Sequence, residues 1–306
     1  MFDRIAHLVL CSPDLAPLMA LYRDHLGFEE QDRTSIDDGS TYQELWRLPT
    51  GPLEVVTLGK PHASGGELRL VHAPQLARPA GPRTMRSAGP FALDLYVRDL
   101  PGLHRRLLEA GHRFRSEPVT YELFGTDFRV DEVLLEAPLG FVHALVEYLP
   151  DRHRCLLATD PRAQVSEFVA AITVVEDVEE ALATLRDALG GQVYFDQPFH
   201  GAAVEKLIGL PAGSSFRTVL LRGPDRRNAR AEVMATVADA PPGPERDHPY
   251  LLQSLAVDDV DAAIRRLGEQ HAVVGPVTPP DGPHAQHRVA TVWTTWGAAL
   301  ELVAPR

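Results

Sequence analysis

The alternation of apolar and polar positions repeats four times along the chain. Each repeat begins with a short apolar strand, passes through an acidic turn and continues as an amphipathic helix, and the four segments are 5–26, 92–110, 171–189 and 254–267. In each segment the spacing of apolar residues changes from the period of a strand to that of a helix. A repeat of this size predicts a chain built from four copies of one small unit.

The ends of the four expected helices are marked in the same way. An aspartate stands at each expected start and a glycine follows each expected end, as N-caps and C-terminal stops commonly do. These residues are Asp14 and Gly27, Asp99 and Gly111, Asp177 and Gly190, and Asp259 and Gly268. The shared pattern argues against chance similarity between the repeats.

Further strand-like runs follow each helix. In the first repeat they are 42–48, 53–58 and 68–71, and in the last they include 288–294 and 298–303. One helix followed by three strands gives a βαβββ unit, so the predicted fold class is α+β. An open sheet of this kind needs cover for its apolar face and edge, and we therefore expect the units to pair into two curved, cup-like or barrel-like sheets.

Proline-rich or polar linkers at 73–90, 150–165 and 238–249 separate the units. The expected organisation is a first domain at 1–150 with modules 1–75 and 88–150, a linker at 151–165, and a second domain at 166–306 with modules 166–238 and 249–306. Because the linker at 150–165 is the longest unpatterned polar one, we expect module 1 to pair with module 2, and module 3 with module 4.

Composition limits the classes of partner. A net charge of −12 in 306 residues argues against a general affinity for nucleic acid or anionic membranes. Cys11 and Cys155 are the only cysteines and no long apolar run occurs, so we expect a soluble cytoplasmic protein without disulfides. The expected partner is a small-molecule ligand or substrate, and the expected state is a monomer or a homodimer.

Two local sequences carry a family resemblance. Residues 21–28 read LYRDHLGF, at the end of the first helix, and residues 296–303 read WGAALELV, across the last expected hairpin. With the four-module pattern, they make the chain similar to the vicinal oxygen chelate superfamily, which includes glyoxalase I, extradiol dioxygenases and the bleomycin-resistance proteins. The resemblance implies paired βαβββ modules that enclose a cup.

It also implies where a site would lie. In that family a divalent metal sits in the cup on His or Glu side chains from the first and last strands of the modules, and such ligands suit Zn, Fe, Mn or Ni. The first-strand positions in this sequence are His7, Asp94, Ile172 and Ser254, and the last-strand positions are Arg69, Ala144, Glu232 and Glu301.

These positions do not supply a metal site by themselves. A catalytic ion of this type needs about three protein ligands, and no pairing of the modules, crossed pairings included, collects them. Arg69 opposes an ion because a guanidinium keeps its positive charge. No cofactor is therefore expected, although a site for Fe, Mn, Ni or Zn stays open as an alternative.

In the first half, Arg69 is a candidate for holding a carboxylate, phosphate or enolate of a substrate, with His7 and Asp94 as catalytic acid and base. The alternative is an internal salt-bridged network that closes the cup. His143 and Glu147 lie near Ala144, but strand alternation places them on the opposite face of the sheet.

In the second half, Glu232 and Glu301 could share a proton and act as a catalytic pair, with Ser254 binding substrate. They could equally hold a weakly bound metal completed by His284 or His287, or be structural residues. For the two histidines, a role as surface polar residues is the favoured interpretation.

Aromatic side chains on the expected strands, Trp46, Tyr121 and Trp293, are candidates for contacts with a planar ligand, or else ordinary core residues. Together these features predict a protein that binds a small molecule, and three functions are open. The first is a metal-independent enzyme for proton transfer, isomerisation, cyclisation or elimination, and the second is a protein that sequesters a ligand. The least favoured is a metal-dependent glyoxalase or dioxygenase.

Overall fold

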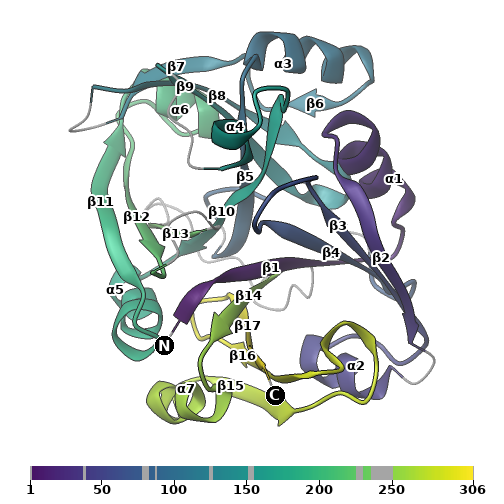
Figure 1. Cartoon of the computed structure of the whole chain (residues 1–306). Helices are drawn as coiled ribbons and strands as arrows, with labels where there is room; N and C mark the ends of the chain where they lie inside the picture. Colours follow the sequence, from purple (N-terminus) through teal and green to yellow (C-terminus); the bar gives the residue numbers. More distant parts are fainter. Residues whose placement is uncertain are drawn as a thin grey trace.

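The structure is a computed structural model that describes residues 2–36, 39–77, 83–86, 88–123, 127–150, 155–224, 230–235 and 251–305. It contains two curved sheets with helices packed on them (Figure 1). None of the helices in these ranges has the length and apolar character needed to cross a membrane. The predicted linker at 238–249 lies outside the described residues.

All four modules follow the predicted βαβββ order. Module 1 comprises β1 (Phe2–Ser12), α1 (Ala16–Met19), the π-helix η1 (Ala20–His25), β2 (Glu29–Ile36), α2 (Ser40–Trp46), β3 (Leu53–Gly59) and β4 (Glu67–His72). Module 2 comprises β5 (Gly89–Val97), α3 (Leu100–Glu109), β6 (Arg113–Phe114), β7 (Val119–Glu122), β8 (Arg129–Glu136), the 3-10 helix η2 (Pro138–Gly140) and β9 (Val142–Leu149).

After α4 (Leu156–Thr159), modules 3 and 4 repeat the order. Module 3 comprises β10 (Val165–Val175), α5 (Val178–Leu182), the π-helix η3 (Ala183–Ala188), β11 (Gln192–His200), α6 (Ala202–Ile208), β12 (Ser215–Arg222) and β13 (Arg230–Ala235). Module 4 comprises β14 (Leu251–Val257), α7 (Val260–Leu267), β15 (Ala272–Val277), the 3-10 helix η4 (Gly282–His284), β16 (His287–Trp293) and β17 (Ala299–Pro305). The predicted α+β class is confirmed.

The predicted helix ends are confirmed in detail. The carboxylates of Asp99, Asp177 and Asp259 each accept a hydrogen bond from a backbone N–H in the first turn of the following helix. Asp14 differs slightly, because Leu15 is the N-cap and the Asp14 carboxylate bonds the Ala16 N–H. The four stop glycines all have positive φ, between 67° and 87°, a conformation that glycine adopts without the strain of a Cβ.

One predicted strand is wrong. Residues 42–48 were expected to be extended, but α2 occupies most of this run, and its Tyr42, Leu45 and Trp46 are buried together. Their spacing of three and four residues places them on one helical face. The strand that belongs in this place is β2, whose sequence is polar and mostly exposed, so it carries no apolar alternation by which it could be recognised.

The pairing of the modules also differs from the expectation. Modules 1 and 4 form one sheet, in the order β15-β16-β17-β14-β1-β4-β3-β2, which we call the 1–4 sheet. Modules 2 and 3 form the other, in the order β11-β12-β13-β10-β5-β9-β8-β6, which we call the 2–3 sheet, with β7 added to β8. The antiparallel pairs β1–β14 and β10–β5 join the modules at the centre of each sheet (Figure 1).

The expected pairing of 1 with 2 and 3 with 4 is therefore wrong, and so is the view that 151–165 separates two sheets, because the 2–3 sheet has strands on both sides of it. Linker length does not decide the pairing. A run of about fifteen residues spans up to ~50 Å when extended, which allows a module to reach either sheet. The complementarity of open strand edges and apolar faces then selects the partner.

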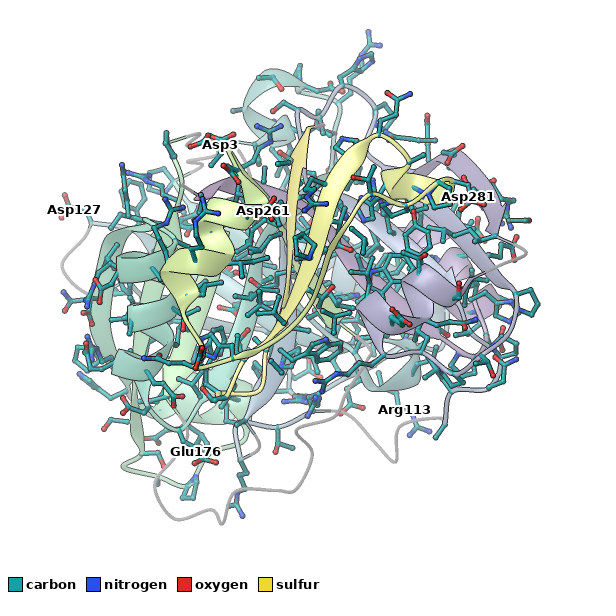
Figure 2. The ribbon with its side chains drawn as sticks, turned by 90° about the horizontal axis from the view of Figure 1, so that it is seen from below. Asp3, Arg113, Asp127, Glu176, Asp261 and Asp281 are labelled. Carbon is teal, nitrogen blue, oxygen red and sulfur yellow. The ribbon has the colours of Figure 1, made fainter. Side chains whose placement is uncertain are left out.

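Three hydrophobic clusters fill the molecule. The largest lies between the two sheets and includes residues of α1, η1, α3, α5, η3 and α7, and it is crossed by a hydrogen bond of 2.9 Å between the Tyr22 hydroxyl and Nε2 of His143. The other two clusters lie on the inner faces of the cups, one on each sheet. Charged side chains labelled in Figure 2, such as Arg113, Asp127 and Glu176, point outward into solvent, so the ionisable groups buried within the cups are exceptions that need an explanation.

Candidate functional site

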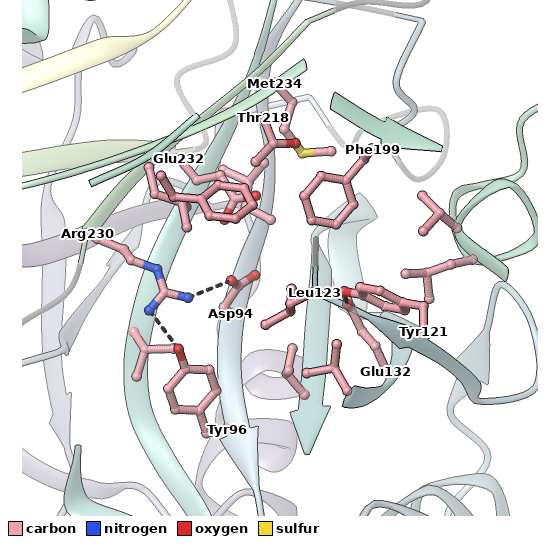
Figure 3. A pocket seen from close by; sticks show the side chains of 18 of the residues that line it. Asp94, Tyr96, Tyr121, Leu123, Glu132, Phe199, Thr218, Arg230, Glu232 and Met234 are labelled. Carbon is pink, nitrogen blue, oxygen red and sulfur yellow. Dashed lines mark hydrogen bonds and ion pairs between the residues drawn. The ribbon is translucent and has the colours of Figure 1, made fainter. Parts of the chain in front are cut away.

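A cavity of about 460 Å³ opens on the inner face of the 2–3 sheet, and we call it the 2–3 cavity. Side chains of β5, β7 to β13 and α6 line it. Most of its wall is aromatic or aliphatic, and its polar groups include the carboxyls of Asp94, Glu132 and Glu232 and the guanidinium of Arg230 (Figure 3). A largely apolar cavity of this size with a few converging polar groups is typical of a small-molecule site.

The strand register brings the first charged pair together. Asp94 of β5 and Arg230 of β13 both stand in register with Ala170 of β10, one on each side of it. Arg230 Nη2 lies 3.8 Å from Asp94 Oδ2, and its Nη1 donates a hydrogen bond of 2.6 Å to the Tyr96 hydroxyl. The small Ala170 side chain leaves room for this pairing across the strand between them.

The three carboxyls of the cavity differ in their readiness to ionise. Burial raises the pKa of Asp94 to about 6, although the Arg230 charge opposes this rise. Burial and the nearby Asp94 charge raise the pKa of Glu132 to about 8. The same two causes raise the pKa of Glu232 well above its usual range. At neutral pH Asp94 is thus largely ionised while Glu132 and Glu232 hold their protons.

Several buried polar atoms at the cavity have no hydrogen-bond partner. They include Oδ1 of Asp94, Oγ1 of Thr218 and Nε of Arg230. Asp94 and Thr218 are 6% and 3% exposed, so solvent reaches these residues only through the cavity. Buried polar atoms without partners are uncommon in folded proteins, and a bound molecule or water would satisfy these.

The cup of the 1–4 sheet is closed by a different group of polar residues. Glu301 is fully buried, and each of its carboxylate oxygens has two partners. Oε1 accepts a hydrogen bond of 2.8 Å from Trp46 Nε1 and lies 3.0 Å from His284 Nε2. Oε2 lies 3.2 Å from His7 Nε2 and accepts a hydrogen bond from the Ser254 hydroxyl. We call these five residues with Arg69 the 1–4 cluster.

Electrostatics within the 1–4 cluster favour neutral His7 beside an ionised Glu301. Burial, reinforced by the Arg69 charge, lowers the pKa of His7 to about 3. Burial opposes ionisation of Glu301, but interactions with His284 and His7 outweigh it and hold the pKa of Glu301 well below its usual range. Arg69 Nη1 lies 3.1 Å from His284 Nε2, so the guanidinium is close enough to balance the carboxylate charge.

The 1–4 cluster contains a set of donors that resembles a metal site. One ligand atom each from His7, His284 and Glu301 lies within 4.8 Å of the others. The strand positions supply only two of these donors, His7 and Glu301, as expected for this crossed pairing, and η4 adds His284 as the third. Two imidazoles and a carboxylate suit Zn, Fe, Mn or Ni.

The charge of the cluster does not fit a divalent ion. The formal charges of Arg69 and Glu301 already cancel, so an added dication would leave a charge of about +2 buried without compensation. The carboxylate oxygens are also fully engaged in hydrogen bonds. We therefore assign no metal-dependent step to this cluster.

The predicted site residues fall into two separate groups. His7, Arg69, Ser254, Glu301 and Trp46 come together in the 1–4 cluster, and Trp293 packs in the hydrophobic cluster of the same cup.

Asp94, Glu232 and Tyr121 line the 2–3 cavity. Asp94 does not join His7 and Arg69, and Glu232 does not face Glu301, because the members of each expected group belong to different sheets. The expected pair of Glu232 and Glu301 is therefore wrong. The carboxyl that lines the same cavity as Glu232 is that of Asp94.

The expected equivalence of the strand positions holds for three modules. Asp94 is in register with Ala144, Ile172 with Glu232, and Ser254 with Glu301. In module 1 the residue opposite His7 is Glu67, and Arg69 lies two positions further along, opposite Val9. The expected alignment of Arg69 with His7 is therefore wrong by two residues. Arg69 and Glu67 still share a face of β4, which is how Arg69 reaches the 1–4 cluster.

Sequence reasoning missed Glu132 and Arg230, and it named His284 as a possible metal ligand but favoured a surface role for it. Arg230 stands two residues before Glu232, so strand alternation alone could have placed both on one face. Glu132 becomes recognisable only when β8 is known to neighbour β9. His284 was expected at the surface, but it is fully buried because η4 folds into the 1–4 cup. The expectation that His143 lies on the opposite face is confirmed by its contact with Tyr22.

The fold defines a class of protein in which paired βαβββ modules form cups. The chain belongs to the Glyoxalase/Bleomycin resistance protein/Dioxygenase superfamily, whose family model matches residues 4–136 and 168–302. No curated protein sequence is significantly similar to this chain.

Solved structures share the architecture. Glyoxalase I from Zea mays superposes with a TM-score of 0.65 at 14% sequence identity, over 98% of this chain and 92% of that one. A putative dioxygenase from Bacillus subtilis gives 0.61 at 12% identity, over 100% of this chain and 86% of that one. TnmS3, an antibiotic-binding protein from Streptomyces sp. CB03234, gives 0.30 at 24% identity over 45% of this chain and 93% of that one. For glyoxalase I and the putative dioxygenase the likeness concerns the fold alone.

Proposed function

We propose that the 2–3 cavity binds a small oxygenated organic molecule and that its acidic side chains transfer a proton on that molecule without a metal ion. The observation that carries the proposal is the neighbouring pair Asp94, which is buried, and Glu232, which is partly buried, two carboxyls with different affinities for a proton that line one cavity. Carboxyls whose surroundings separate their pKa values in this way are suited to act as base and acid.

The roles follow from the protonation states at neutral pH. The ionised Asp94 removes a proton from a carbon beside a carbonyl group of the ligand, and Glu232 gives its own proton to the carbonyl oxygen. In an α-hydroxy carbonyl ligand, protonated Asp94 then gives its proton to the former carbonyl carbon, while the Glu232 carboxylate takes the proton of the neighbouring hydroxyl group, whose oxygen becomes the new carbonyl oxygen. Both carboxyls regain their starting states, and no electrons are gained or lost. Arg230, whose Nε has no partner, can stabilise negative charge that develops on the ligand oxygen.

A second candidate function is sequestration of a ligand without turnover. It is favoured by the aromatic wall, in which Tyr121 and Phe199 make an edge-to-face contact with ring centroids 6.1 Å apart and Phe199 stacks on Phe216 at 5.8 Å. Such a wall suits a planar ligand whether or not a reaction follows. The metal-dependent alternative has three donors in the 1–4 cluster, His7, His284 and Glu301, but it is disfavoured because the charges of Arg69 and Glu301 already balance there.

The test is deuterium incorporation from D2O into a panel of α-hydroxy and α-oxo carbonyl compounds, followed by proton NMR with the full-length chain. Exchange should occur with a bound compound and fall by about a hundredfold or more in Asp94→Asn and Glu232→Gln. Asp131→Asn is the matched control, since Asp131 lies beside Glu132 on β8 but bonds Thr120 outside the cavity. Binding without exchange would overturn the enzyme proposal in favour of sequestration.

A further inference from the structure

Glu132 is a buried carboxyl of the 2–3 cavity that lacks a cationic partner. It is 9% exposed, and its Oε2 accepts a hydrogen bond from the Tyr121 hydroxyl. Asp94, in contrast, has Arg230 beside it. Among the residues that the structure describes, no Lys, Arg or His side chain forms an ion pair with Glu132. The acid is therefore held in its neutral form when the cavity is empty.

The basic side chains that line the cavity are both engaged away from Glu132. Three acidic side chains and two basic ones line it, and both arginines are engaged elsewhere, Arg230 with Asp94 and Tyr96, and Arg222 over the Tyr194 ring at 4.4 Å. In Figure 3, Arg230 and Tyr96 lie on one side of the cavity, and Tyr121 and Glu132 lie on the other. An ionised Glu132 would therefore have no positively charged partner within the protein on its side of the cavity.

The other ionisable groups that line the cavity come from six strands and from the start of α4. They are Asp94 and Tyr96 of β5, Tyr121 of β7, Tyr148 of β9, Tyr194 of β11, Arg222 of β12, Arg230 and Glu232 of β13, and Cys155 before α4. The helix α6 contributes only apolar side chains to the cavity.

Two further observations point to a ligand at this place. Buried Oγ1 of Thr218 and Oδ1 of Asp94 line the cavity without a hydrogen-bond partner. The rings of Tyr121, Phe199 and Phe128 also line it, and aromatic faces attract cations as well as flat apolar groups. An aromatic molecule with a positively charged donor would satisfy the rings, the acid and the unpaired acceptors together.

We propose that the 2–3 cavity takes an aromatic ligand that carries a basic amine, and that the Glu132 carboxylate pairs with the ammonium group. This inference rests on the proposal that the 2–3 cavity is the ligand site. On binding, the O–H bond of the neutral Glu132 carboxyl breaks, its proton leaves to solvent, and the carboxylate forms an ion pair with the ammonium. No electrons are transferred.

The test uses two probes that differ only in charge, 2-naphthylmethylamine and 2-naphthalenemethanol, with the full-length chain at neutral pH. Isothermal titration calorimetry in phosphate and in Tris buffers measures affinity and proton release together. For probes of this size we expect dissociation constants of about 1 mM for the weaker binder. The amine should bind at least about tenfold more tightly than the alcohol and release roughly one proton per molecule bound.

Glu132→Gln keeps the size of the side chain and a hydrogen bond to Tyr121 but cannot become an anion. It should reduce the preference for the amine to about twofold or less and abolish the proton release, while alcohol binding stays the same. Glu122→Gln is the matched control, because Glu122 is an exposed glutamate of the neighbouring strand β7. It should behave as the wild-type chain does.

The outcomes separate this inference from the proposed function. Equal binding of amine and alcohol without proton release would overturn the amine proposal and leave the cavity as a ligand site. Tight amine binding that Glu132→Gln does not weaken would also overturn it. If neither probe binds and no compound of the carbonyl panel binds either, the ligand site itself is wrong.

Discussion

At the scale of single residues, the two cups differ in whether their buried carboxyl groups are ionised. In the 1–4 cluster Glu301 has four hydrogen-bond partners and Arg69 nearby, so its charge is compensated within the protein. In the 2–3 cavity Glu132 and Glu232 remain protonated instead, because burial is not offset by enough positive charge. The first arrangement stabilises a closed core, and the second leaves acidic groups available to a ligand.

The low pKa of His7 predicts a loss of stability in acid. The pKa of His7 is about 3 in the folded chain and about 6.5 in the unfolded chain, so as the pH falls the imidazole is protonated in the unfolded chain first. The stabilisation is complete above pH 6.5 and is lost as the pH falls toward 3. Between pH 6 and 4 the wild-type free energy of unfolding should fall by ~1.4 kcal/mol per pH unit relative to His7→Gln.

Urea unfolding at a series of pH values measures this difference. His25→Gln is the control, because His25 is an exposed histidine at the end of η1 and should give a profile parallel to the wild type. A difference between wild type and His7→Gln that does not change with pH would mean that folding leaves the pKa of His7 unchanged.

The charge balance of the 1–4 cluster predicts weak binding of divalent metals. Because Arg69 already compensates Glu301, the purified chain should hold far less than one equivalent of Fe, Mn, Ni or Zn by mass spectrometry, and EDTA should leave its melting temperature unchanged. Arg69→Met should remove the opposing charge and allow Co2+ to bind His7, His284 and Glu301. The variant's affinity should exceed that of the wild type by about a hundredfold.

Adding His284→Ala to the Arg69→Met variant should abolish this gain, which separates binding in the cluster from adventitious binding elsewhere. The wild-type chain could instead hold one equivalent of metal, and EDTA could remove it and lower the melting temperature. That result would refute the charge argument and restore a metal-dependent function.

At the scale of elements, short helices placed between strands determine which cup is open. In module 1, α2 brings Trp46 onto Glu301, and in module 4, η4 brings His284 to the same carboxylate. These two insertions fill the 1–4 cup. In module 3, α6 stands at the place that α2 takes in module 1, but it presents only the apolar side chains of Val204, Leu207 and Ile208 to the 2–3 cavity.

The N-caps of the long helices give a prediction for one element. The Asp99 carboxylate accepts a hydrogen bond of 2.9 Å from the Gly102 N–H at the start of α3. Asp99→Ala should lower the free energy of unfolding by ~1 kcal/mol, and Asp99→Asn should recover most of it. Urea unfolding tests this. Glu109→Ala at the exposed end of α3 is the control, and an equal loss in both alanine variants would contradict the capping role.

At the scale of the whole molecule, the crossed pairing makes the two halves of the chain interdependent. Each sheet contains strands from both halves, joined at β1–β14 and at β5–β10, and the largest hydrophobic cluster includes residues of all four modules. Neither half contains a complete cup. The halves therefore behave as one folding unit rather than as two separable domains.

Cleavage of the chain between Pro150 and Cys155 tests this interdependence. A protease recognition sequence inserted there should allow complete cutting, yet the two fragments should elute together on gel filtration at micromolar concentration and separate only in urea. Two continuous sheets and a shared core hold them together. Fragments that separate in native buffer would show that the modules pair within each half.

The sequence by itself determined the repeating unit. Four strand–helix segments with aspartate starts and glycine ends predicted the βαβββ modules, because alternation, capping and positive φ are local properties of the chain. The polar strand β2 could not be predicted from alternation, since it buries few side chains. The inward-facing positions of Asp94, Glu232 and Glu301 were predictable too, because strand alternation sets the face on which a side chain lies.

The tertiary structure alone decided which positions meet. Module pairing depends on complementary edges and faces between segments far apart in the chain, and this separated Glu232 from Glu301 and joined His7 to Glu301. Module pairing also decided the protonation states of these carboxyl and imidazole groups, since pKa values depend on burial and on neighbours contributed by other modules. A cluster completed by His284 and a cavity completed by Glu132 and Arg230 are thus products of the assembled fold.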